Sequence, residues 1–190
     1  MSENKKPSQM IILKDMTSPY NTEKWQPRNF RGFERVVNGR IVNAEGKKNF
    51  CIFLPQSINR IMGGQEEWVD CEQLIEEGWN ISKNENPTDP QAEPSYMLRV
   101  KVKYHPDDSD LVRLNPKVRI VTASGMTMDM DEENIGDLDN MQIVKANITI
   151  RATWQDTPSY TGYVAYLNKL VVRVYEEVGG MDELMEGILD

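Results

Sequence analysis

Residues 96–104 combine basic and apolar side chains in regular alternation. Arg99, Lys101 and Lys103 occupy every second position, and the positions between them are aliphatic. In an extended strand such residues share one face at intervals of about 6.6–6.8 Å, two residues of strand rise. That interval is close to the spacing of phosphates along a single polynucleotide strand, so the row indicates a track for a polyanion. The alternative is the solvated face of an ordinary sheet.

Further cations and aromatic rings occur close together elsewhere in the sequence. Stacking of a base on an aromatic ring contributes about 1–3 kcal/mol and tolerates any base sequence, while cations contact the phosphates. Many of these rings would serve equally in a hydrophobic core, to which we assign Trp68. The residues expected to contact nucleic acid are Arg31, Lys47, Lys48, Arg99, Lys101, Lys103 and Arg151 for the phosphates, and Phe30, Trp79, Trp154 and Tyr160 for the bases.

The charge of the chain is divided unevenly along its length. Residues 1–60 carry 11 basic against 5 acidic residues, and residues 61–190 carry 11 against 25. A net acidic chain argues against nucleic acid, whereas a basic part beside an acidic tail can bind a polyanion selectively. We expect the tail to compete for the basic groove or to recruit a protein partner, and a solubilising tail is the alternative. Its acids include Asp182, Glu183, Glu186 and Asp190.

The sequence lacks the residue sets of metal sites and of common enzymes. One histidine, His105, and two cysteines, Cys51 and Cys71, are too few for a zinc site of four Cys or His ligands in one chain. The acidic run at residues 129–139 does not fit an EF-hand, because asparagine occupies both the sixth and the twelfth positions. No phosphate-binding Gly-Lys-Ser/Thr loop and no Gly-x-Ser-x-Gly motif occurs. We therefore expect no metal, no cofactor and no enzyme activity.

Period-2 alternation and turn residues predict a mainly β fold, either a small barrel or a sandwich. Strands are expected at residues 33–42, 49–54, 96–104, 117–122, 143–154 and 162–175, with one helix at 66–77 between the early strands. The predicted domain spans residues 28–178. A flexible arm at 1–27 precedes it, with residues 11–13 apolar enough to dock as an edge strand, and an acidic tail at 179–190 follows it. No apolar stretch is long enough for a membrane helix or a signal peptide, so a cytoplasmic location is expected.

A resemblance to a known family runs through residues 28–178. It lies in Asn29-Phe30-Arg31-Gly32-Phe33, in residues 45–54, in a helix that ends in Glu77-Gly78-Trp79, and in residues 96–104, 138–154 and 165–167. In order and pattern these segments resemble single-stranded DNA-binding proteins encoded by bacteriophages. The resemblance implies a five-stranded OB-fold barrel, a role in phage DNA replication or recombination, and an acidic tail. This tail departs from the usual pattern, because it ends in Leu189-Asp190 and not in an aromatic residue.

Together these features predict an OB-fold-like five-stranded barrel, with added strands and one helix, that binds single-stranded DNA without sequence preference in the host cytoplasm. Replication or recombination proteins are the expected partners of the tail. The oligomeric state and the choice between DNA and RNA stay open. The alternative is a phage interaction or structural protein that binds a host protein through its acidic surface, and a magnesium-dependent nuclease ranks third.

Overall fold

A computed structural model describes residues 6–16, 34–37, 40–43, 48–85, 93–141 and 143–174. Within these residues the chain is mainly β with a single α-helix, as predicted. The elements are β1 (Gln9–Met16), β2 (Glu34–Val37), β3 (Arg40–Asn43), β4 (Lys48–Phe53), β5 (Ile58–Met62), β6 (Gln65–Val69), α1 (Cys71–Glu77), β7 (Ile81–Asn84), β8 (Ser95–Val102), η2 (Asp110–Leu114), β9 (Lys117–Val121), β10 (Thr127–Met130), η3 (Ile135–Asn140), β11 (Ile143–Thr157) and β12 (Tyr160–Val174). No described helix is long and apolar enough to cross a membrane.

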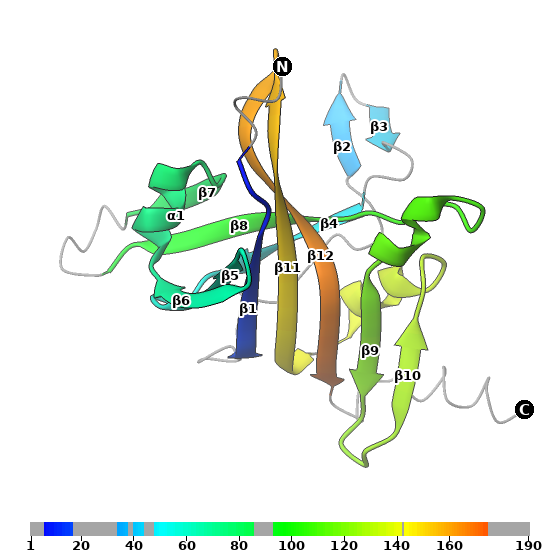
Figure 1. Ribbon diagram of the computed structural model, residues 1–190. Helices are drawn as coiled ribbons and strands as arrows, with labels where there is room; N and C mark the ends of the chain where they lie inside the picture. The colour runs from blue at the N-terminus through cyan, green and yellow to red at the C-terminus, as the bar shows by residue number, and fades with distance from the viewer. Residues whose placement is uncertain are drawn as a thin grey trace, which may run out of the picture.

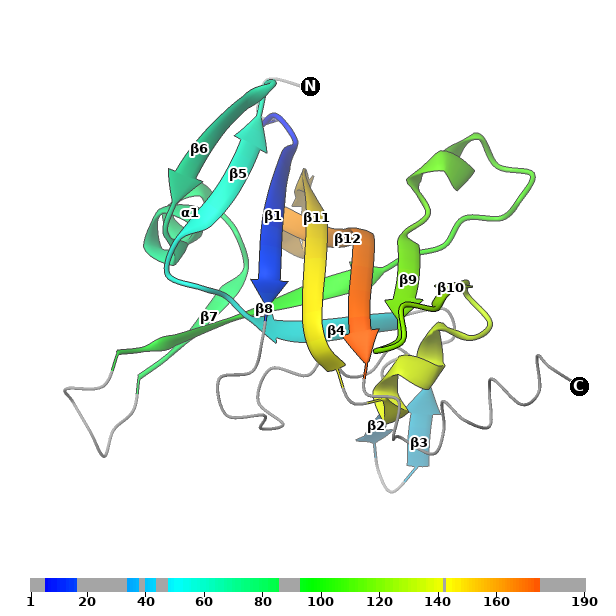
Figure 2. The ribbon, with the colours of Figure 1, turned by 90° about the horizontal axis from the view of Figure 1, so that it is seen from below.

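Ten of these strands form one open sheet, and β2 and β3 pair separately. The main order is β10-β9-β12-β11-β1-β5-β6, with β8 joining β12 to β4 and β7. β4 and β8 cross the direction of β1, β11 and β12 in both ribbon views (Figures 1 and 2). The added strands and the single helix between early strands agree with the sequence-based prediction.

The central pair of the sheet is the antiparallel hairpin of β11 and β12, each 15 residues long. On β11 the side chains of Ala146, Ile148 and Ile150 are buried at 0–1% exposure, and the residues between them point outward. This is the predicted alternation of an amphipathic strand. On β8 the same pattern buries Leu98 and Val100 and exposes Arg99.

A β-bulge in β12 reverses the alternation of buried and outward side chains along the strand. Ile150 pairs with Leu167 and Thr149 pairs with Lys169, so Asn168 is the extra residue. Before the bulge the odd-numbered residues such as Leu167 are buried, whereas after it the even-numbered residues such as Leu170 are buried. Without this bulge Lys169 would point into the core.

β1 is an interior strand of the sheet. It pairs with β11 on one side and with β5 on the other, and Ile11 and Leu13 are buried at 0% and 2% exposure. The predictions of a flexible arm at 1–27 and of an edge strand at 11–13 are therefore wrong for residues 9–16, and the sheet begins at Gln9 rather than at residue 28. The short apolar run carried no sign of a second neighbouring strand.

The predicted helix at 66–77 divides into a strand and a shorter helix. Gln65–Val69 is β6, and α1 begins after Asp70, whose carboxylate accepts a hydrogen bond from the Gln73 N–H at 2.8 Å. This N-cap fixes the start of the helix. The strand geometry turns Trp68 outward, where it is 71% exposed. Its assignment to the core is therefore wrong, because that assignment rested on helical spacing.

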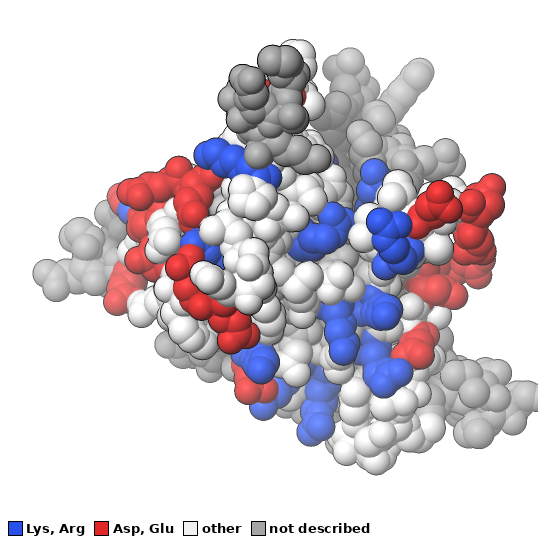
Figure 3. All heavy atoms as spheres, in the orientation of Figure 1, with Lys and Arg blue, Asp and Glu red and all other residues white. Residues whose placement is uncertain are grey.

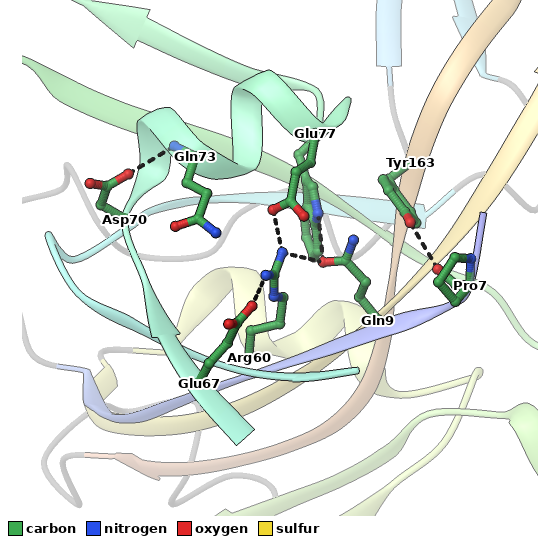
Figure 4. A network of polar contacts seen from close by, with 9 residues as sticks. Pro7, Gln9, Arg60, Glu67, Asp70, Gln73, Glu77 and Tyr163 are labelled. Atoms are coloured by element: carbon green, nitrogen blue, oxygen red, sulfur yellow. Dashed lines mark hydrogen bonds and ion pairs between the residues drawn. The ribbon is translucent and has the colours of Figure 1, made fainter. Parts of the chain in front are cut away.

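The buried side chain of Arg60 connects four elements of the structure. Arg60 on β5 is 2% exposed and forms ion pairs with Glu67 on β6 and Glu77 on α1. It also donates to Gln9 Oε1 on β1 at 3.2 Å, and the same oxygen accepts from Trp79 Nε1 at 3.1 Å (Figure 4). A charge at this depth is stable only when it is paired and hydrogen-bonded, and this network provides both.

Two glycines let the α1 end meet the β11–β12 hairpin. The Tyr163 N–H donates to the Gly78 carbonyl at 2.9 Å, and Gly78 ends α1 with a φ of 109°. A Cβ on Gly162, whose φ is 149°, would lie 2.6 Å from the Gly78 oxygen and 2.8 Å from the Tyr160 hydroxyl. Only glycine permits this approach of two backbones.

We therefore expect Gly162→Ala to lower the free energy of unfolding by more than about 2 kcal/mol, measured by urea unfolding. Gly125→Ala is the matched control, because Gly125 has a φ of 90° and no atom of the described residues lies within 4 Å of its added Cβ. It should cost only the backbone strain, about 1–2 kcal/mol. Equal losses in the two variants would show that the close approach contributes nothing.

Candidate nucleic-acid interface

The outward side of the central strands carries a concentration of cations, which we call the basic face. It consists of Lys14 on β1, Lys145 and Arg151 on β11, Lys169 and Arg173 on β12, and Lys117 and Arg119 on β9. Figure 3 shows basic side chains gathered over β11, β12 and β9, with acidic side chains to either side, over β6 and α1 and near η2. Acidic borders of this kind confine a polyanion to the cationic strip between them.

The strand register sets the outward side chains in rows across the sheet. One row runs from Lys101 on β8 through Tyr166 on β12 and Arg151 on β11 to Met10 on β1. The Arg151 guanidinium lies over the Tyr166 ring at 5.1 Å, a cation–π contact. This row places an aromatic ring between two cations, the combination that phosphate contact and base stacking require.

A second row begins with two lysines and ends with a tryptophan. Lys117 on β9 lies opposite Lys169 on β12, and the row continues across Thr149, Ile12 and Asn59 to Trp68 on β6. Basic and aromatic side chains from strands far apart in the sequence thus share one face.

Like charges stand directly opposite each other at two places on the basic face. Lys169 faces Lys117, and Lys145 faces Arg173. Among the described residues, Lys117, Lys169 and Arg173 have no ion-pair partner, whereas Lys145 contacts the Asp15 carboxylate at 3.2 Å. Directly opposed like charges destabilise a sheet, so a ligand with negative charge is the group that would relieve them.

A small hollow of about 240 Å³ lies at the end of this face where β1 and β12 end and β11 begins. Its lining includes Lys145, Arg173 and Asp15. Asn147, on the strand between β1 and β12, also lines it. Asp15 has a φ of 55° and its N–H donates to Asn147 Oδ1 at 2.8 Å, which holds the carboxylate beside Lys145.

At the β10 edge of the sheet, the hydrogen bond from Arg119 lowers the pKa of the Asp129 carboxyl.

The sequence-predicted cations that the structure describes lie on exposed or half-exposed outward positions. Arg99, Lys101 and Lys103 alternate with buried residues of β8 and beyond its end, and Lys101 joins the row of Arg151. Phe30, Arg31 and Lys47, the side chain of Lys48, and the tail acids Asp182, Glu183, Glu186 and Asp190 lie outside the described residues, so their roles stay predictions.

The three sequence-predicted aromatic platforms that the structure describes, Trp79, Trp154 and Tyr160, all contact Tyr163. Trp79 is 4% exposed, with its ring 5.9 Å from Tyr163, so its assignment as a base-stacking residue is wrong for this structure. Trp154 makes an edge contact with Tyr163 at 5.1 Å, and the Lys6 ammonium lies 4.4 Å from its centroid. Tyr160 donates to the Tyr163 carbonyl at 2.7 Å, and burial raises the pKa of its hydroxyl.

Several residues of the interface were not among those expected to contact nucleic acid, although Lys117, Lys169, Arg173 and Tyr166 belong to the cations and aromatic rings that occur close together in the sequence. Lys117, Lys169, Arg173, Tyr166 and Trp68 come together only through strand pairing. The alternation of 117–121 and 143–154 was visible in the sequence, but the identity of neighbouring strands and the bulge at Asn168 were not.

The two cysteines differ in their burial. Both are free thiols, Cys51 half-buried and Cys71 buried. Burial, with help from Asp70 and Glu72, raises the pKa of the Cys71 thiol to about 11, so it stays protonated and unreactive near neutral pH.

An open sheet face with rows of cations and interleaved aromatic rings is typical of proteins that bind a single-stranded polyanion. The comparison with protein families makes this specific: the chain belongs to the family described as "Putative phage ssDNA-binding domain", which it matches over residues 8–178. This membership supports single-stranded DNA as its ligand, and the match begins one residue before β1. No curated protein and no solved structure matches the chain.

Removal of one opposed charge should stabilise the sheet. We expect Lys169→Gln to raise the free energy of unfolding by about 0.2–1 kcal/mol at low salt, measured by urea unfolding, and the gain should shrink at 1 M salt because the repulsion is screened. Lys83→Gln is the control, since Lys83 pairs with Glu72 at 2.7 Å and its loss should not stabilise. A destabilised Lys169→Gln variant at low salt would contradict the repulsion.

Proposed function

We propose that this protein coats single-stranded DNA without sequence preference and that the basic face is its binding surface. The observation that carries the proposal is the pair of opposed cations Lys117 and Lys169, which have no ion-pair partner in the part of the chain that the structure describes, in a row that ends in an aromatic ring. Backbone phosphates would neutralise the cations, and bases would stack on half-buried rings of this face such as Tyr166. No bond is made or broken, since binding rests on counterion release and stacking.

The biological setting that fits this chemistry is phage DNA replication or recombination, in which exposed single strands need protection. The acidic tail at 179–190 would occupy the basic face in the absence of DNA or recruit replication proteins. Residues 179–190 carry four acids and no base, so the tail is opposite in charge to the basic face. The host cytoplasm is the expected location.

The first test measures the salt dependence of binding by fluorescence anisotropy with labelled oligo-dT. Each phosphate contact on a single strand contributes about −0.7 to the slope of log K against log salt. The double variant Lys117→Gln/Lys169→Gln should therefore lower the magnitude of the slope by about 1.4 and weaken binding at every salt concentration. Lys83→Gln removes a positive charge that lies outside the basic face, so it should leave the slope unchanged. An unaltered slope in the double variant would remove the basic face from the proposal.

The second test concerns the tail. A chain that ends after Val178 should bind oligo-dT more tightly than the full chain at low salt, because the competing acids are gone, and the difference should shrink as salt screens the tail. Equal or weaker binding by the shortened chain would contradict self-competition. A tail peptide that captures a replication protein would then point to recruitment as its role.

A further inference from the structure

A groove lies at the end of the second row of the basic face, beside Trp68. We call it the Trp68 groove. It has a volume of about 560 Å³ and lies between β1, β5, β6 and the segment that joins β4 to β5. Its lining includes Ile12, Lys14, Phe53, Pro55, Asn59 and Trp68. A cavity of this size suits a small planar ligand.

The indole of Trp68 is the most exposed large apolar side chain among the described residues, at 71%. A tryptophan on a solvated strand offers a wide, rigid aromatic face on which a planar ligand can stack. Its cross-strand neighbour is Asn59, and Ile12 follows on the next strand. The ring therefore stands on the same face as Lys169 and Lys117.

Asn59 supplies a polar group at the base of the groove. Its Oδ1 is buried and accepts no hydrogen bond from the described residues. A buried acceptor without a donor costs about 1–3 kcal/mol, so the Asn59 amide, which is part of the groove lining, would gain by turning its oxygen toward a ligand that brings an N–H. The common nucleobases all offer such a donor on their pairing edge.

Lys14 adds a positive charge at the rim. It is exposed, lies two residues along β1 from Ile12, and has no ion-pair partner among the described residues. The distance along the sheet from Trp68 to Lys169 is four strand spacings, about 19 Å. One DNA strand of a few nucleotides can therefore contact both ends of the row.

We infer that the Trp68 groove is a nucleobase-binding site, in which one unpaired base stacks on Trp68, donates a hydrogen bond to Asn59 and places its phosphate near Lys14. This inference rests on the proposed binding of single-stranded DNA and assigns a base to a defined place on the sheet. A nucleotide matches all three features, whereas an apolar side chain of a protein partner would use only the ring.

The test compares Trp68→Ala with the wild type on two labelled oligomers of equal length, oligo-dT and an abasic sugar-phosphate strand. Stacking of one base corresponds to a loss of about 5- to 150-fold in affinity for oligo-dT. The two proteins should bind the abasic strand equally, because it has no base to stack. Trp68→Phe, which keeps a ring, should retain most of the affinity for oligo-dT.

Leu111→Ala is the matched control, since Leu111 is also an exposed apolar residue, at 43%, and lies on η2 away from the groove. It should bind both strands as the wild type does. Equal affinity of Trp68→Ala and wild type for oligo-dT would overturn the base site, and so would an equal loss on the abasic strand. A wild type that binds neither strand would instead overturn the proposed function itself.

Discussion

The register of the β11–β12 hairpin is the constraint on which the rest of the structure depends. The ladder runs from the pair Ile143–Val174 to the pair Thr157–Tyr160, and every other central strand is placed relative to it. A slip of one residue would exchange the buried and the outward side chains along its length. The bulge at Asn168 is part of this constraint, because it turns Lys169 outward while Leu170 returns to the core.

The basic face illustrates how binding and stability oppose each other in this sheet. Lys169 opposite Lys117 and Lys145 opposite Arg173 repel one another, and the apolar inner face offsets that repulsion through residues such as Leu170 and Val172, both at 0% exposure. Burial of one such side chain contributes about 1.5–3 kcal/mol, more than an exposed repulsion costs. Burial of the inner face therefore keeps the sheet stable despite the repulsion on the basic face, and a bound polyanion would reduce that repulsion.

The sequence was sufficient for the parts of the fold that depend on local pattern. The alternation at 96–104 and 143–154, the mainly β class and the single helix before Gly78 all follow from period and capping residues. Features that depend on distant partners could not be predicted from it. β1 needed both β5 and β11 to become interior, and Trp68 turned outward because Asp70 starts the helix later than the apolar spacing indicated.

The candidate site follows the same division. Lys101 and Arg151 were identified from strand faces, but their common row with Tyr166 exists only through the β8–β12 bridge. Photo-cross-linking of an oligomer that contains 5-iodouracil, followed by mass spectrometry of the cross-linked peptides, tests the central claim most directly. The account predicts cross-links at Tyr166 and at Trp68. Cross-links confined to peptides outside β1, β5, β6, β8, β9, β11 and β12 would contradict it.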